Sequence, residues 1–117
     1  MFKSVKETDK YGNEQTHYYL TQGDSCTITS TPYKDGEMVD VSEVSECKFK
    51  LASLDYNKEF GKDLYLSGDH FVLKLTHEDT KDWAVGQHIY EIEYLMKDDD
   101  VQTPHSWKFD IVNQIPD

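Results

Sequence analysis

The sequence has 117 residues, of which 37% are hydrophobic and 13% aromatic, so it can build one hydrophobic core and has too little chain for a second domain. Its 23 acidic and 12 basic residues give a formal net charge of -11, which repels phosphate backbones and anionic bilayers. We therefore expect no nucleic acid and no membrane among its partners. No apolar run is long enough to span a bilayer and the start of the chain has no signal-peptide core, so we expect a cytoplasmic protein at synthesis.

Residues 1–14 are too polar to form a core strand. They predict a polar N-terminal arm or an edge hairpin, with its turn at Tyr11, Gly12 and Asn13. The remaining residues, 15–117, are expected to form the folded domain.

Apolar and polar residues alternate with period two along the rest of the chain, which is the pattern of strands with one buried face. The inward-facing sets are, in chain order, Cys26, Ile28 and Ser30; Cys47, Phe49 and Leu51; Phe71, Leu73 and Leu75; Tyr90, Ile92, Tyr94 and Met96; and Trp107, Phe109 and Ile111. Two weaker strands are predicted at His17–Thr21 and Leu64–Leu66. The capping-box pattern of Thr76–Asp79 predicts one helical turn between strands.

About seven short strands separated by Gly, Asp, Asn and Pro turns predict an all-β fold, an immunoglobulin-like (Ig-like) antiparallel β-sandwich. Tyr90 begins its strand shortly after Gly86 and is a candidate for an anchor of the tyrosine-corner type. The predicted core is taken from the inward phases of the strands: Ile28, Phe49, Leu51, Phe71, Leu73, Leu75, Ile92, Trp107 and Phe109.

We predict no catalytic, cofactor-binding or metal-binding residue, and therefore no enzyme and no cofactor. The five histidines show no metal-binding spacing, and Ser25 has no predicted base or oxyanion donor beside it. Without an export signal, Cys26 and Cys47 are expected to stay free thiols. The carboxylates of Asp98–Asp100 allow a calcium-binding loop or a solvated hairpin turn, and the lack of alternating ligands favours the turn.

Aromatic residues at strand ends and in loops are the remaining candidates for a functional surface, because exposed tyrosines are common in binding sites. The candidate interaction surface consists of Tyr18, Tyr19, Tyr33, Tyr56 and Tyr65. These residues leave a carbohydrate- or surface-binding module open as an alternative to a protein-interaction module.

Three motifs carry a resemblance to a known family. Gly23-Asp24 precedes a Thr-rich strand, Asp35-Gly36 precedes Val39-Asp40-Val41 and the strand of Phe49, and Leu75–Thr80 is followed by Trp83, Gly86 and the strand of Tyr90. In this order the chain from Leu20 to Ile111 resembles the small Ig-like domains of bacteriophage tail and baseplate proteins, including the N-terminal domains of upper baseplate proteins. The sequence departs from the pattern at Asp98–Asp100, where a glycine is expected.

The resemblance implies a non-catalytic structural or interaction module of a phage or prophage virion, tail or baseplate, and hence a place in the phage particle after synthesis. It implies other virion proteins as partners, together with further copies of the chain itself in an assembly. No catalytic or binding residue can be carried over, because the matching motifs determine turns.

Overall fold

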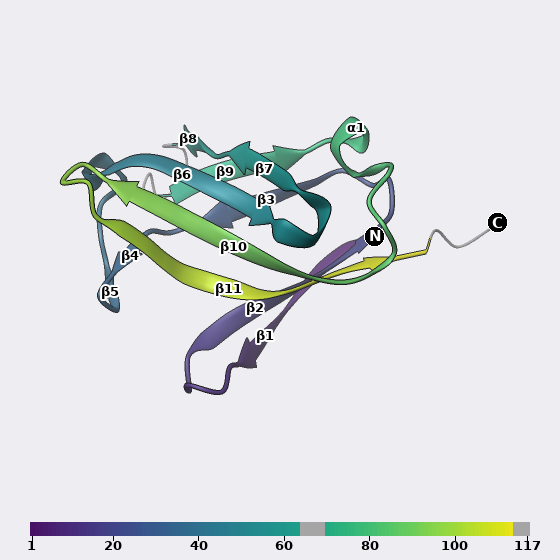
Figure 1. The fold of residues 1–117 in the computed structure, drawn as a ribbon, viewed down its shortest axis with the longest axis horizontal. Coiled ribbons are helices and arrows are strands. Elements are labelled where there is room, and N and C mark those ends of the chain that lie inside the picture. Colours follow the sequence, from purple (N-terminus) through teal and green to yellow (C-terminus); the bar gives the residue numbers. More distant parts are fainter. Residues whose placement is uncertain (64–69, 114–117) are drawn as a thin grey trace.

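The computed structural model describes residues 1–63 and 70–113 (Figure 1). The helical segments are short and comprise the 3-10 turns η1 (Val41–Glu43) and η2 (Ala52–Leu54) and the four-residue α1 (His77–Thr80). None of the helices in these ranges has the length and apolarity needed to cross a membrane. The strands are β1 (Phe2–Thr8), β2 (Glu14–Thr21), β3 (Cys26–Ser30), β4 (Tyr33–Lys34), β5 (Glu37–Met38), β6 (Val44–Leu51), β7 (Tyr56–Glu59), β8 (Gly61–Asp63), β9 (His70–Leu75), β10 (Gly86–Met96) and β11 (Val101–Val112).

The strands form two packed layers. A six-stranded sheet has the order β1-β2-β11-β10-β6-β7, and a three-stranded sheet with the order β3-β9-β8 lies over part of it (Figure 1). Strands β4 and β5 form a separate two-stranded ribbon. Neighbouring strands are antiparallel except β2 and β11, which run parallel from the pair Tyr18 and Phe109 to the pair Thr21 and Val112. The predicted all-β, Ig-like sandwich is confirmed.

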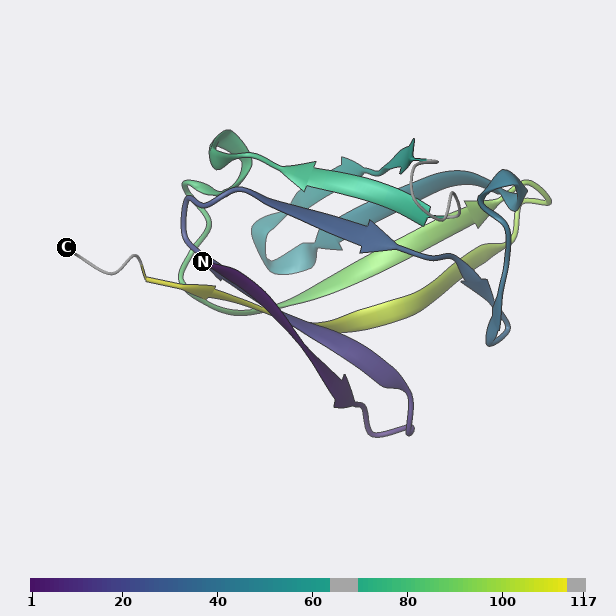
Figure 2. The ribbon, with the colours of Figure 1, turned by 180° about the vertical axis from the view of Figure 1, so that it is seen from behind.

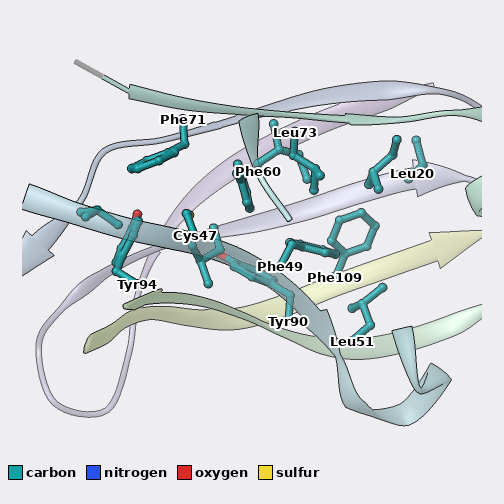
Figure 3. Packing of buried hydrophobic residues seen from close by; sticks show 14 of the residues in the cluster. Leu20, Cys47, Phe49, Leu51, Phe60, Phe71, Leu73, Tyr90, Tyr94 and Phe109 are labelled. Atoms are coloured by element: carbon teal, nitrogen blue, oxygen red, sulfur yellow. The ribbon is translucent and has the colours of Figure 1, made fainter. Parts of the chain in front are cut away.

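Aromatic rings fill the space between the two sheets (Figure 3). Phe49 on β6 stacks on Tyr90 of β10 with 6.0 Å between the ring centroids, and it meets Phe109 of β11 edge-on at 5.9 Å. The alternation in the sequence therefore predicts the inner face of these strands correctly, as it does for the other buried residues of the predicted core: Ile28, Leu51, Phe71, Leu73, Leu75 and Ile92.

The prediction that Trp107 is buried is wrong. Its indole is half-buried, the N–H donates to the Glu7 carboxylate at 2.8 Å, and the Lys108 ammonium lies 4.8 Å from the ring centroid. Strand β11 pairs with β2 only from Phe109 onward, so β2 does not cover the position of Trp107. The indole N–H also requires an acceptor, which a fully apolar core would not supply.

Residues 1–14 contribute β1 and the turn of a hairpin with β2. All seven residues of β1 pair in register with β2. In the turn, the Asp9 carboxylate accepts hydrogen bonds from the backbone N–H groups of Tyr11 and Asn13, both at 2.9 Å, and Gly12 has a φ of 83°, which a side chain would disfavour. The hairpin turns away from the three-stranded sheet (Figure 2).

The predicted helical turn is confirmed as α1. The Thr76 hydroxyl accepts a hydrogen bond from the Asp79 N–H at 3.3 Å, and the Asp79 carboxylate accepts one from the Thr76 N–H at 2.7 Å, which completes the capping box. The weak strand His17–Thr21 lies within β2, whereas Leu64–Leu66 lies outside the described residues.

Tyr90 anchors a distant strand. Its hydroxyl donates to the Thr16 carbonyl on β2 at 2.6 Å, across the sheet. A tyrosine corner instead bonds to backbone a few residues upstream, so this residue has a related role with a different partner.

Candidate functional site

Several histidines hold turns and strands in place. The His77 ring donates from Nδ1 to the Gly23 carbonyl at 2.7 Å. The His88 ring donates from Nε2 to the Ala84 carbonyl at 2.7 Å, and its Nδ1 accepts from the Ser53 hydroxyl at 2.7 Å. Across residues 1–63 and 70–113, no three His, Cys, Asp or Glu side chains are grouped so that they could hold a metal ion.

The two cysteines lie in different layers, Cys26 on β3 and Cys47 on β6, and both are free thiols. Burial raises the pKa of Cys26 to about 12 and places the pKa of Cys47 well above its usual range. Because the thiolate is the reactive form, both side chains act as small apolar packing residues at neutral pH.

Two of the tyrosines proposed for an interaction surface pack against the sandwich core. The Tyr18 ring lies 5.2 Å from the Tyr90 ring, and burial raises the pKa of Tyr18 to about 12. The Tyr56 ring meets Trp83 edge-on at 4.9 Å, and its hydroxyl is buried. Both residues are half-buried and pack against the core.

The other tyrosines lie in separate places. Tyr19 stacks on His17 at 4.2 Å, on the face of the hairpin that points away from the core. Tyr33, in the β4–β5 ribbon, meets His105 edge-on at 5.7 Å. Tyr65 lies outside the described residues. Among the four candidate tyrosines that the structure describes, no ring contact joins any two, so these four do not form one aromatic surface.

The Asp98–Asp100 segment is the turn between β10 and β11, and a lysine side chain forms ion pairs with it. Asp99 has a φ of 69°, and the Asp98 carboxylate accepts from the Asp100 N–H at 3.1 Å. Lys34 Nζ lies 3.0 Å from Asp98 and 3.7 Å from Asp100, and its hydrogen bond lowers the pKa of Asp98. This geometry fits a hairpin turn whose negative charge is partly offset by one lysine.

A polar cluster fastens the β1–β2 hairpin to β11. The buried imidazole of His17 lies between two carboxylates, with Nδ1 at 3.1 Å from Glu7 and Nε2 at 2.8 Å from Asp110. The Trp107 N–H donates to the same Glu7 carboxylate and holds the pKa of Glu7 below its usual range. Strands β1, β2 and β11 are thus joined through side chains as well as through their backbones.

The side-chain amide of Gln15 bridges the place where β2 and β11 no longer pair. Its oxygen accepts from the Ser106 N–H at 3.3 Å, and its nitrogen donates to the Pro104 carbonyl at 3.4 Å. The amide therefore bonds to the β11 backbone much as the peptide group of a neighbouring strand would. Sequence reasoning missed Gln15 and His17 because buried polar residues on a strand have no periodic signature of their own.

A groove of about 880 Å³ lies between the hairpin and β3. One wall contains every residue from Thr27 to Thr31, and the hairpin contributes Ser4, Thr16 and Tyr18 from the face that points toward the core. Tyr90 and Ile92 also line the groove. The groove depends on where β2 leaves the sheet, which no sequence motif indicates.

No family model matches the sequence, and no curated protein matches it. Among solved structures, the chain is similar to the Clostridium thermocellum CbhA fibronectin(III)-like modules, with a TM-score of 0.51 and 15% sequence identity over 98% of this chain and 100% of that chain. At this identity the similarity is one of fold, and it agrees with the two-layer architecture described above. The chain therefore has a fibronectin III-like, Ig-like β-sandwich fold.

Proposed function

We propose that this domain is a non-catalytic structural and interaction module that serves as a tail or baseplate component of a phage or prophage particle. The observation that carries the proposal is β1, the outer strand of the β1–β2 hairpin, which is fully paired although it adds little to the core. In β1 only Phe2 and Glu7 are even half-buried, yet every residue of the strand is paired. An ordered strand with so little burial is well suited to contact another molecule.

The hairpin offers surfaces that a partner can use. Tyr11 at its tip is 77% exposed, and Val5 on the face that points away from the core is 41% exposed. Within residues 1–63 and 70–113 the outer edge of β1 has no strand beside it, and Lys3, Lys6 and Glu7 supply charges that discourage unspecific pairing. A ring of identical subunits needs a contact between two different patches of one surface, and the hairpin supplies one such patch.

The assignment to a phage particle rests on the turn motifs that resemble tail and baseplate domains, and the fibronectin III-like fold is compatible with it. The carbohydrate-binding alternative has less support, because the four candidate tyrosines that the structure describes are dispersed and half-buried. Partner proteins of the particle and other copies of the chain are the proposed partners.

Particles induced from cells that encode the chain test this proposal. Mass spectrometry of purified particles should detect the chain in a fixed ratio to the major tail proteins, and a Tyr11→Ser, Val5→Ser variant should be incorporated poorly. Particles that contain tail proteins and lack the chain would contradict the virion role. Normal incorporation of the variant would contradict the role of the hairpin.

A further inference from the structure

We propose that the outer edge of β3 is a binding site for an extended segment of a partner protein, which adds to the three-stranded sheet as a further strand. Strand β3 is the last strand of its sheet, and within the described residues the backbone of Cys26–Ser30 is hydrogen-bonded only to β9. Its other edge presents unpaired N–H and C=O groups, whose natural ligand is another extended backbone. The free stretch ends at Thr31, whose carbonyl accepts from the Tyr94 hydroxyl at 3.0 Å.

The two layers of the sandwich differ in width, and this difference leaves room for the added strand. Six strands face three, so the inner face of the β1–β2 hairpin is only partly covered by the opposite sheet: Leu20 is buried, whereas Ser4 and Thr16 on the same face line the groove. The groove of about 880 Å³ lies over the uncovered part of this face. Because Thr27–Thr31 line the groove without interruption, the backbone edge of β3 itself forms the wall. A strand placed about 4.8 Å from β3 would enter the groove and extend the smaller sheet over the hairpin.

Among the edge strands that the structure describes, β3 alone lacks the charges that prevent association. No charged residue occurs between Asp24 and Lys34, and Thr27 and Thr29 on its exposed face have the β-branched shape that favours strands. Strands β1, β7 and β8 each contain lysine together with an acidic residue. Natural sheets guard their edges with such charges, so an unguarded edge beside a groove is the expected property of an acceptor.

The charges around the groove indicate a basic partner segment. Its acidic lining residues are Glu14, at the start of β2, and Asp35, in the turn between β4 and β5. The turn that precedes Glu14 and the turn that contains Asp35 lie at the same end of the molecule (Figure 1). The lining lysine, Lys6, donates to the Thr16 hydroxyl at 2.8 Å. The chain carries a net charge of -11, which disfavours a second acidic copy in this groove, whereas a neutral strand with a lysine or arginine at one end is favoured there.

This inference goes beyond the proposed function and does not depend on it. The groove would bind a strand whether or not the domain belongs to a particle. Failure of the chain to enter particles would leave the groove unaffected, and failure of the groove would leave the role of the hairpin open to its own test.

A synthetic peptide, Lys-Thr-Val-Thr-Val-Thr with blocked ends, serves as the probe against the full isotope-labelled chain. The peptide should slow amide hydrogen exchange at residues 26–30 and leave 56–59 on the β7 edge unchanged. A peptide with proline in place of the first valine should bind at least about tenfold more weakly, since it loses a backbone donor and the extended pairing. Replacing the lysine by serine should weaken binding several-fold.

Variants of the chain separate edge pairing from unspecific adhesion. Thr29→Lys should weaken binding of the lysine peptide at least about tenfold, whereas Thr29→Val and the β7-edge control Asn57→Lys should leave it unchanged. The Glu14→Gln, Asp35→Asn double variant leaves β3 intact and should abolish the preference for lysine over serine. Equal binding of all peptides, or protection at β7, would overturn the proposal. A dimer that Thr29→Lys dissociates would overturn the choice of a basic partner in favour of a second copy.

Discussion

Truncation of Phe49 to alanine should cost about 3–5 kcal/mol of the free energy of unfolding, the range typical of large buried rings. Phe49 is 0% exposed and has four aromatic neighbours, with centroid distances of 5.9 to 6.5 Å. Each aromatic pair adds about 0.5–1.5 kcal/mol to the effect of buried area, and alanine loses all four. The whole domain is expected to have a stability of about 5–15 kcal/mol, so the variant retains only part of it.

Urea unfolding followed by tryptophan fluorescence measures the loss. With a slope of about 1–3 kcal/mol per molar urea, the midpoint should fall by at least about 1 M while the slope stays unchanged. Trp107→Ala is the matched control, because it removes a larger ring that is only half-buried, and its cost should be less than half as large. Because this control lacks one of the two tryptophans, its unfolding is monitored by circular dichroism instead of fluorescence. A loss below about 1.5 kcal/mol for Phe49→Ala, or equal losses for the two variants, would refute this account of the core.

Three further predictions follow from the polar and sulfur-containing groups. Burial alone would raise the pKa of Asp79, but hydrogen bonds from Lys58 and Thr76 lower it to about 2. The pKa of Asp79 in the folded state lies below the reference value of 3.8, so this carboxylate stabilises the fold above pH 3.8 and the contribution is lost as the pH falls toward 2. Asp79→Asn should therefore reduce the change in the free energy of unfolding over this pH range by about 1 kcal/mol, after allowance for solvent screening. Glu7→Ala should accelerate amide hydrogen exchange throughout β1 while the melting temperature of the sandwich changes little, and unchanged exchange would contradict the fastening role of the polar cluster. Cys26 and Cys47 should react with iodoacetamide only after denaturation, giving two labels by intact-mass analysis, and rapid labelling of both in the native protein would contradict the burial of Cys47 and the partial burial of Cys26.

The sequence predicts a strand face well where burial decides it. In β3, β6, β9 and β10 the alternating residues lie between two sheets, so their apolar phase and their buried phase coincide. The same reasoning fails at Trp107, because alternation assigns a side chain to a face without showing whether the next strand covers that face. The capping box was predictable since Thr76 and Asp79 interact over three residues of chain.

The hairpin's position and the groove could not be predicted, because both depend on pairing between distant residues. The turn at Gly12 indicates a hairpin, but nothing local indicates that β2 runs parallel to β11 or leaves it before Trp107. The polar cluster of Glu7, His17 and Asp110 likewise assembles three segments that are far apart in sequence. The candidate tyrosines were expected to be exposed because they lie near strand ends or in loops. In the structure, tertiary packing leaves the four described candidates half-buried.

The parallel pairing of β2 with β11 also has a consequence for the order of events during folding. Tyr18 and Phe109 are direct partners although they lie 91 positions apart in the sequence (109 - 18 = 91), so this part of the sheet closes only after β11 has been synthesised. The β1–β2 hairpin involves only neighbouring residues and can form early. During synthesis the hairpin therefore stays undocked until β11 is available. The nascent chain most needs protection from aggregation in the interval before the hairpin docks on β11.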